Sequence, residues 1–220
     1  LLVARKGDFC LAVKAGDNDD SHNHNDTGSF TVYRDGEPLF VDIGVETYQK
    51  KTFSPRRYEI WTMQSQYHNL PTFYETADGS GDGIMQQAGP QYRAKDTVCR
   101  MEPDVTRIRM DLADAYPDER IRAYERTVTL ENGRLTVEDR ADCRPLVPVL
   151  SLITSRMPVW EEETGMLVLG GDTPEAVSVQ VTGAASVQVE RLPITDARLQ
   201  TAWKQDLWRT QVVFAGDLLK

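Results

Sequence analysis

The three histidines of this 220-residue chain are the residues whose types and spacing point most directly to chemistry. Two of them, His22 and His24, lie within one hexapeptide, residues 21–26. In an extended segment, side chains two positions apart point to the same face, so we expect the two imidazoles to lie side by side. Imidazole binds borderline metals and titrates near neutral pH, so this pair can ligate a metal, move a proton, or divide the two roles. A polar loop whose histidines only form hydrogen bonds is the alternative, and the His-x-His spacing alone does not exclude it.

Two short strands joined by a turn should position this hexapeptide. Residues 28–33 alternate apolar and polar side chains, Asp35 and Gly36 form a turn dipeptide, and residues 39–44 read as the returning strand. An Asp-Gly pair between two apolar runs predicts a β-hairpin. Pairing of these strands can bring Asp42 close to the histidine loop. A carboxylate at an apolar strand end is costly unless it is paired or coordinates a cation, so Asp42 is a candidate metal ligand.

The third histidine, His68, completes a candidate metal site. His24, Asp42 and His68 together offer nitrogen and oxygen donors that suit zinc with one coordination position left open. We therefore predict that these three residues bind a zinc ion.

The order of these motifs resembles the β-sheet domain of the heparinase II/III-like polysaccharide lyases. The resemblance covers roughly the first two thirds of the chain well and the remainder loosely, and it rests on residues 21–26, 28–30, 35–38, 42–44, 67–69, 124–128 and 135–139. It implies that His24 is a zinc ligand, completed by Asp42 and His68, and that His22 is a catalytic histidine. Asp26 also belongs to the pattern, either as a partner that orients a histidine or as a cap of the turn.

The activity implied by the resemblance is β-elimination at a uronic acid in a polysaccharide such as a glycosaminoglycan or alginate. A base removes the C5 proton, an acid protonates the departing glycosidic oxygen, and the product gains a 4,5 double bond. His22 would act as the base or help to neutralise the carboxylate, and zinc would have a structural role in holding the histidine loop. Two other classes stay open: a non-catalytic carbohydrate-binding β-sandwich, and a metal-dependent hydrolase in which His22 or Asp26 activates a zinc-bound water.

Members of this family carry an N-terminal (α/α) toroid that supplies a catalytic tyrosine and much of the substrate cleft, and nothing in this sequence resembles it. We therefore expect residues 1–220 to be the β-sandwich domain of a larger lyase, with a small β appendage from about residue 160 as a finer division. We also expect the isolated domain to be inactive without that toroid, and the parent protein to be secreted or periplasmic.

A basic and aromatic loop precedes His68. Its basic residues are Lys50, Lys51, Arg56 and Arg57. The carboxylate of a uronate must be neutralised before its C5 proton becomes acidic enough to remove, so we predict that Arg56 and Arg57 bind substrate, together with Tyr67 and Asn69. A solvated loop face whose charges serve solubility is the alternative.

The rest of the sequence predicts strands rather than helices. Asn132 and Gly133 between two alternating segments are a strong hairpin signal. Further apolar or alternating runs of strand length cover residues 9–16, 95–101, 105–112, 121–130, 135–140, 147–153, 166–169, 177–181, 185–190 and 207–214. Many antiparallel strands at short spacing predict an all-β fold, an antiparallel two-sheet β-sandwich of supersandwich type with long loops.

Composition narrows the function classes further. With 40% hydrophobic residues the chain can bury an ordinary core, and no stretch is long and apolar enough to span a bilayer. A formal net charge of −9 argues against nucleic-acid binding and against strong long-range attraction of sulfated glycans. We interpret Cys10, Cys99 and Cys143 as buried apolar residues, with a disulfide between Cys10 and Cys143 as the alternative.

Overall fold

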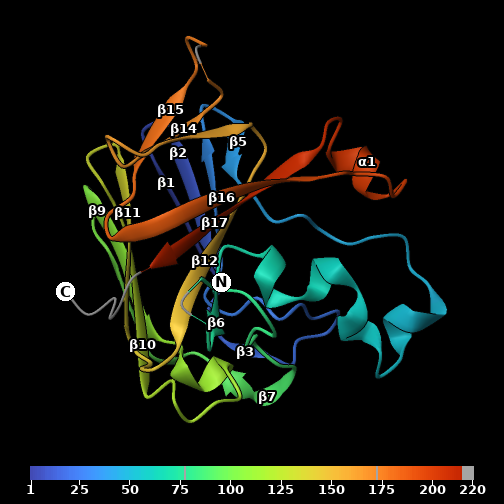
Figure 1. Cartoon of the computed structure of the whole chain (residues 1–220). Coiled ribbons are helices and arrows are strands. Elements are labelled where there is room, and N and C mark those ends of the chain that lie inside the picture. Colours follow the sequence, from blue (N-terminus) through green and yellow to red (C-terminus); the bar gives the residue numbers. More distant parts are fainter. Residues whose placement is uncertain (77, 172, 215–220) are drawn as a thin grey trace.

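The computed structural model describes residues 1–76, 78–171 and 173–214, and in this part the chain is built almost entirely of strands and loops (Figure 1). Its one α-helix there is the single turn α1 (Leu199–Ala202). No helix in these ranges is long and apolar enough to cross a membrane.

The largest sheet has eight strands, and all of its paired strands are antiparallel. Its order is β1-β2-β4-β5-β12-β17-β16, with β6 also paired to β12. The strands are β1 (Leu2–Lys6), β2 (Phe9–Val13), β4 (Phe30–Arg34), β5 (Glu37–Phe40), β6 (Pro71–Tyr74), β12 (Val147–Thr154), β16 (Ala184–Leu192) and β17 (Leu207–Phe214). Strand β12 is central because it pairs with β17 on one edge and with both β6 and β5 on the other.

A second sheet of four strands has the order β11-β10-β9-β8. Its strands are β8 (Lys95–Met101), β9 (Val105–Asp111), β10 (Ala123–Glu131) and β11 (Arg134–Asp142). The predicted turn between β10 and β11 is confirmed, since Asn132 and Gly133 have φ values of +48° and +71°. Asparagine and glycine tolerate this left-handed conformation, which matches the twist of the two strands.

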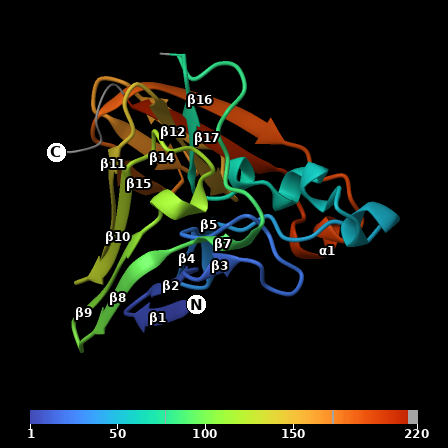
Figure 2. The same ribbon diagram turned by 90° about the horizontal axis from the view of Figure 1, so that it is seen from below.

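The hydrophobic core lies between these two sheets (Figure 2). The large sheet contributes Leu11, Val13, Phe30 and Val32, and the four-stranded sheet contributes Ile108, Met110, Val128 and Leu130. Inward-facing apolar residues of two antiparallel sheets therefore form one core, as in other β-sandwiches. The predicted all-β fold is confirmed.

Two smaller sheets complete the fold. Strands β13 (Pro158–Glu161), β14 (Met166–Leu169) and β15 (Val177–Gln180) form one, and β3 (Asp17–Asn18) pairs with β7 (Gly89–Arg93) in the other. Leu167 and Leu169 of β14 belong to the same core cluster as the two main sheets. This part of the chain, beyond residue 160, therefore shares the core of the first part.

The segment before β6 consists of four 3-10 turns, η1 (Lys50–Phe53), η2 (Arg57–Glu59), η3 (Trp61–Met63) and η4 (Ser65–Tyr67). A further 3-10 turn, η5 (Ala113–Ala115), follows β9. The three cysteines are free, and the expectation that all of them are buried is wrong: Cys143 is buried, Cys10 is half-buried and Cys99 is exposed. Cys99 lies on the edge strand β8, where all seven residues are exposed. It pairs with the buried Ile108 of β9, but β8 itself is not covered by other residues of the described structure, so the Cys99 side chain remains exposed.

Candidate metal centre

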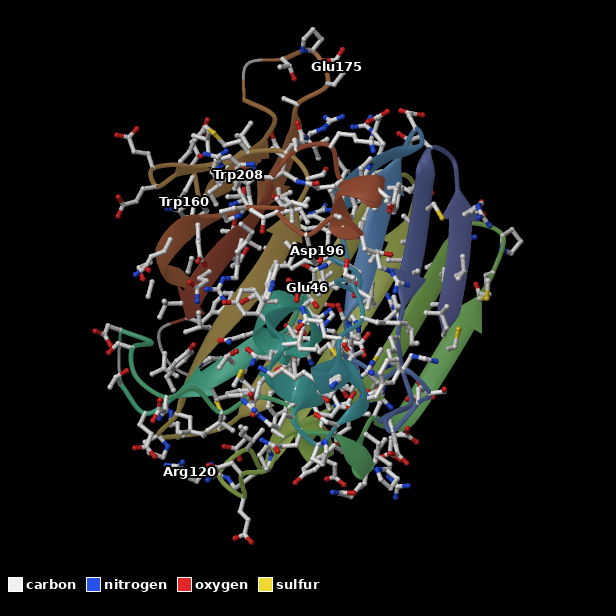
Figure 3. The ribbon with its side chains drawn as sticks, turned by 90° about the vertical axis from the view of Figure 1, so that its right-hand side faces the viewer. Glu46, Arg120, Trp160, Glu175, Asp196 and Trp208 are labelled. Carbon is white, nitrogen blue, oxygen red and sulfur yellow. The ribbon has the colours of Figure 1, made fainter. Side chains whose placement is uncertain are left out.

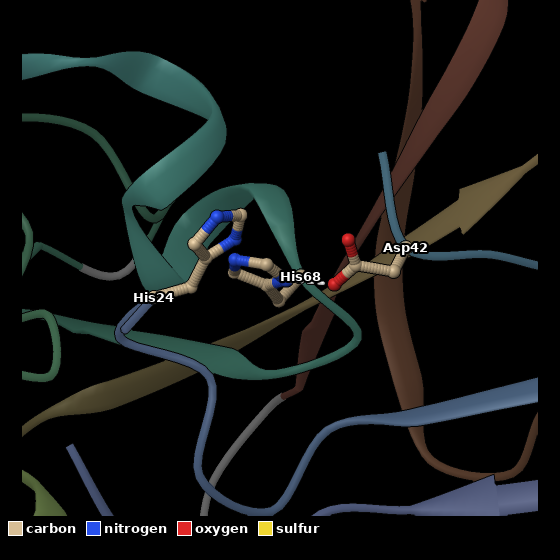
Figure 4. Close-up of side chains that lie close together, drawn as sticks. All are labelled: His24, Asp42 and His68. Carbon is tan, nitrogen blue, oxygen red and sulfur yellow. Dashed lines mark ion pairs between the residues drawn. The ribbon is translucent and has the colours of Figure 1, made fainter. Parts of the chain in front are cut away.

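The structure brings His24, Asp42 and His68 together, although the three residues come from separate segments (Figure 4). His24 lies in the loop between β3 and β4, Asp42 follows β5 by two residues, and His68 ends the 3-10 turn η4. One donor atom from each side chain lies within 4.8 Å of the others. The proximity expected from the hairpin is therefore observed, and metal binding by the three residues stays a prediction.

The donor set fits a metal ion in three respects. Three atoms no more than 4.8 Å apart can all lie within about 2.8 Å of one point, so a small inward shift reaches zinc bond lengths of about 2.0–2.2 Å. His24 and His68 are buried, while Asp42 is partly exposed, which leaves access for a further ligand. His68 Nδ1 pairs with Asp42 Oδ2 at 2.9 Å, whereas the buried Nε2 of His68 has no hydrogen-bond partner in the described structure. A buried nitrogen without a hydrogen bond is costly, and coordination would satisfy it.

Electrostatics keep two of the three donors ready for coordination. Burial lowers the pKa of His24 to about 4, and the neighbouring His68 adds to this effect, so His24 is neutral at neutral pH. Burial opposes ionisation of Asp42, but the charge of His68 and its hydrogen bond to the carboxylate outweigh burial and hold the pKa of this carboxyl below its usual range. Burial also favours neutral His68, but the Asp42 carboxylate reverses this and raises the pKa of the imidazole. Metal binding would therefore displace a proton from His68.

Asn69 anchors His68 to strands β4 and β12 and to the residue that follows β5. Its Nδ2 donates hydrogen bonds to the carbonyl oxygens of Phe30 and Val41, at 2.7 and 3.2 Å, and its Oδ1 accepts one from the amide of Ile153 at 2.7 Å. The side chain is completely buried. Substrate binding by Asn69 stays a prediction, and its contacts give it a role in placing the adjacent His68.

The loop that carries His24 is held by two buried amide side chains. Asn18 Oδ1 accepts hydrogen bonds from the Thr27 amide at 3.3 Å and from the Thr27 hydroxyl at 2.8 Å. Gln86 accepts from Asn18 Nδ2 at 3.0 Å and donates to the Thr27 carbonyl at 2.7 Å. Asp26 forms an ion pair with Lys14 at the edge of this network. The loop is thus fixed on both sides of His24.

A buried arginine joins the two main sheets at this site. Arg126 of β10 pairs with Asp139 of β11, with Nε–Oδ1 and Nη2–Oδ2 distances of 2.7 and 2.6 Å. Its Nη1 donates to the carbonyl oxygens of Gly28 and Asn69, at 2.9 and 2.6 Å. Gly28 ends the histidine loop and Asn69 follows His68, so Arg126 connects the two segments that carry the histidines.

His22 lies apart from the three-residue group. The expectation that His22 and His24 share one face of an extended segment is wrong, because His22 is exposed and His24 is buried. His22 has a φ of +62°, and the Asn23 amide donates to the Asp20 carbonyl in a turn. A left-handed residue within a turn breaks the period-two alternation on which that expectation depended.

The predicted substrate-binding residues of the basic loop differ in their surroundings. Arg56 is exposed and forms a bidentate pair with Glu59, at 2.8 Å for both contacts. Arg57 is half-buried and donates from Nε to the Asn23 carbonyl at 3.0 Å, which fixes the residue between His22 and His24. Arg57 Nη2 is buried and has no hydrogen bond in the described structure. Both substrate-binding assignments stay predictions, and the contact with Asn23 gives Arg57 an additional role in shaping the loop.

Tyr67 lines a cavity of about 180 Å³ with Trp61, Glu46 and Asp196, the last two labelled in Figure 3. Its ring packs edge-on against Trp61, with ring centroids 5.0 Å apart, and the guanidinium of Arg209 lies 4.5 Å from its centroid. Trp61 Nε1 donates to Glu46 at 2.8 Å. Substrate binding by Tyr67 stays a prediction, and the half-buried ring packs between Trp61 and Arg209.

Sequence reasoning missed Asn18, Gln86 and Arg126. Nothing in the local sequence marks Asn18 or Gln86, because their partners are distant in the chain. Arg126 does carry a signal: it occupies an inward position between the buried Tyr124 and Val128, and Asp139 lies opposite it on β11. A charged residue in the apolar phase of a strand requires a partner, and this pair provides it.

Comparisons with known proteins agree with this architecture. The sequence matches the family model for the heparinase II/III-like C-terminal domain over residues 1–191. No curated protein sequence gives a significant match. The structure of heparan sulfate lyase HepC from Pedobacter heparinus is similar with a TM-score of 0.65 and 17% identity, covering 96% of this chain and 31% of that chain. A crystal structure of heparinase III is similar with a TM-score of 0.61 and 15% identity, covering 94% of this chain and 33% of that one.

The chain therefore spans about a third of the length of these two structures. At such low identity the structural likeness shows the fold alone. The family model, in contrast, matches most of the sequence. We conclude that the chain belongs to the family of heparinase II/III-like C-terminal domains.

Proposed function

We propose that this chain is the β-sandwich domain of a polysaccharide lyase that cleaves uronic-acid-containing glycans by β-elimination. The observation that carries the proposal is a single loop, in a domain of this family, that presents the exposed His22 and places His24 beside Asp42 and His68. One of the similar structures is that of a heparan sulfate lyase, which supports a uronate glycan as the substrate class.

His22 is the proposed catalytic residue of this domain. In the elimination, the C5–H bond breaks and its proton passes to a base, the electron pair forms the C4–C5 double bond, and the C4–O bond breaks. An exposed imidazole can accept this proton or hydrogen-bond to the substrate carboxylate. Arg57, which holds the Asn23 carbonyl, supports the position of His22.

Zinc held by His24, Asp42 and His68 would supply a structural cross-link between the histidine loop, the end of β5 and the end of η4. Asn69 and Arg126 then fix the two histidine segments to the rest of the sandwich. In this arrangement the zinc ligands and their partners together place the loop that carries His22. The partly exposed carboxylate of Asp42 is the ligand that solvent can reach.

An acid that protonates the leaving oxygen is the other requirement of the reaction. We assign this role to a tyrosine of an (α/α) toroid in the full-length protein, which would also provide much of the substrate cleft. The short span of this chain relative to the similar structures supports this assignment. The domain alone should then be inactive.

The test is a lyase assay of the full-length protein on heparan sulfate and alginate, following the ultraviolet absorbance of the unsaturated product. His22→Asn is the sharper variant, because asparagine accepts the φ of +62° found here whereas alanine does not. We expect turnover to fall roughly 10²- to 10⁴-fold, with zinc content unchanged. Wild-type turnover in H22N would remove His22 from the mechanism.

The same assay separates the two other classes. Cleavage without new ultraviolet absorbance would indicate a hydrolase, because hydrolysis forms no double bond. Glycan binding without cleavage in the full-length protein would indicate a carbohydrate-binding module. Either result would refute the lyase assignment.

A further inference from the structure

Two exposed aromatic side chains, Tyr48 and Phe53, form a patch that reaches His22 through Tyr48. Phe53 is 68% exposed and Tyr48 is 38% exposed, and their rings meet edge to face with centroids 5.4 Å apart. The ring of Tyr48 is also stacked with that of His22, at a centroid distance of 6.0 Å and an interplanar angle of 9°. Single exposed apolar residues are common on protein surfaces, but a contiguous aromatic patch beside a candidate catalytic group points to a ligand.

A cation completes this patch from a distant part of the chain. The guanidinium carbon of Arg198 lies 4.4 Å from the ring centroid of Tyr48. Arg198 is exposed, and no ion pair of its guanidinium is found among the described residues. Its position over an aromatic ring orders it without neutralising it, so its charge is available to an anion.

The patch is built on an ordered framework. Asp196 accepts hydrogen bonds from the amide and hydroxyl of Thr47, at 3.0 and 3.3 Å, and from the amides of Arg198 and Leu199, at 2.9 and 3.2 Å (Figure 3). These four bonds join the loop that carries Tyr48 to the start of α1, which carries Arg198. The aromatic rings and the cation are therefore held together before a ligand arrives, which lowers the entropy cost of binding.

The charge around the patch favours an acidic ligand. Lys50 lies between Tyr48 and Phe53 in the sequence, and Lys51 and Arg56 follow, sharing the single carboxylate of Glu59. This local excess of cations contrasts with the net charge of −9 of the whole chain. A sugar ring offers an apolar face to aromatic side chains, and a uronate adds a carboxylate for a guanidinium.

We propose that Tyr48, Phe53 and Arg198 form a binding subsite for one uronate residue, adjacent to His22. The aromatic rings contact the apolar face of the sugar, and Arg198 pairs with its carboxylate. This inference rests on the proposed function for its substrate class, because it takes His22 as the neighbouring reactive group. Tyr48, Phe53 and Arg198 would then hold the glycan next to the imidazole of His22.

The experiment compares Phe53→Ala and Arg198→Gln with wild type in the full-length protein, using a uronate hexasaccharide in titration calorimetry and in the lyase assay. We expect Kd and KM to rise roughly two- to tenfold for F53A and roughly tenfold or more for R198Q, with kcat little changed. Arg198→Lys should recover only part of the loss, because lysine lacks the planar fork. Met157→Ala is the matched control, since Met157 is also exposed, at 53%, and lies outside the patch.

The outcomes distinguish this inference from the proposed function. Unchanged Kd and KM in F53A and R198Q would overturn the subsite even if H22N abolishes turnover. Weakened uronate binding in both variants, in a protein that forms no unsaturated product, would keep the subsite and refute the lyase. Equal loss of binding for a neutral hexasaccharide in R198Q would overturn the role of the guanidinium. A lower melting temperature of the full-length protein in F53A, with unchanged KM, would give Phe53 a packing role only and would also overturn the subsite.

Discussion

Replacing Asp139 by asparagine should destabilise the fold far more than its small chemical change suggests. Arg126 is completely buried and the Asp139 side chain is only 9% exposed, so the variant leaves a buried guanidinium without a counter-ion. Breaking such a pair typically costs about 3–5 kcal/mol. The matched control is Glu125→Gln on the neighbouring strand β10, because Glu125 pairs with Arg109 at the surface, where the side chains are 38% and 50% exposed. That pair should contribute less than about 1 kcal/mol.

The assay is urea unfolding of both variants and of wild type, with a chelator present so that metal binding does not contribute. If the free energy of unfolding falls no more in D139N than in E125Q, the argument that burial sets the strength of the ion pair is refuted. The double variant Arg126→Met with Asp139→Leu adds a second test. An apolar replacement of a buried pair is often neutral for stability, but it removes the hydrogen bonds to Gly28 and Asn69. We therefore expect this variant to unfold near wild type yet to bind zinc more weakly.

Two further predictions concern the metal centre. The native chain should contain about one zinc by mass spectrometry, and His24→Ala should lose it while His22→Asn keeps it; retention in H24A would exclude His24 as a ligand. Zinc retention should fall as the pH is lowered through the raised pKa of His68, because the ion must displace its proton, and His24 should add to the loss only near pH 4. The chelated protein should show the opposite trend above pH 6.5: a raised pKa in the folded state stabilises the protein below that pH, and the contribution is lost as the pH rises through the folded value. Urea titrations with and without chelator at several pH values would show whether the two trends diverge.

Local signals predicted much of the fold. The Asp35–Gly36 and Asn132–Gly133 turns carry positive φ values, and both hairpins form as the dipeptides indicate. The alternation of β9 also matches its burial, with every second side chain turned to the core. These features depend on residues that are close in sequence, so the sequence alone is enough to predict them.

Strand β6 was missed for a physical reason. All four of its residues are buried, so no polar face alternates with an apolar one. It lies against the central strand β12, and one of its paired positions is Pro148. A short strand covered on both faces, with proline in its sequence and opposite it, lacks the periodicity from which strands are predicted.

The proximity of the three candidate ligands was predicted, whereas the direction of His22 was not. His24, Asp42 and His68 converge as their donor types suggested. The different direction of His22 follows from its turn and from the Arg57 contact with Asn23, which come from tertiary structure. Nothing in the spacing of the two histidines encodes that contact.

The order of the site in the chain has a consequence for biogenesis. The three candidate ligands all lie at or before residue 68, whereas two of the groups that hold their segments lie much later in the chain. Arg126 reaches back 98 positions to Gly28, and Ile153 reaches back 84 positions to Asn69. During synthesis, a chain completed as far as residue 120 would carry all three donors, with the histidine loop held by Asn18 and Gln86 but not yet by Arg126 or β12. Metal capture by the proposed site would therefore be coupled to the closing of the sandwich, and a loaded centre would report that the second sheet and β12 have reached their places.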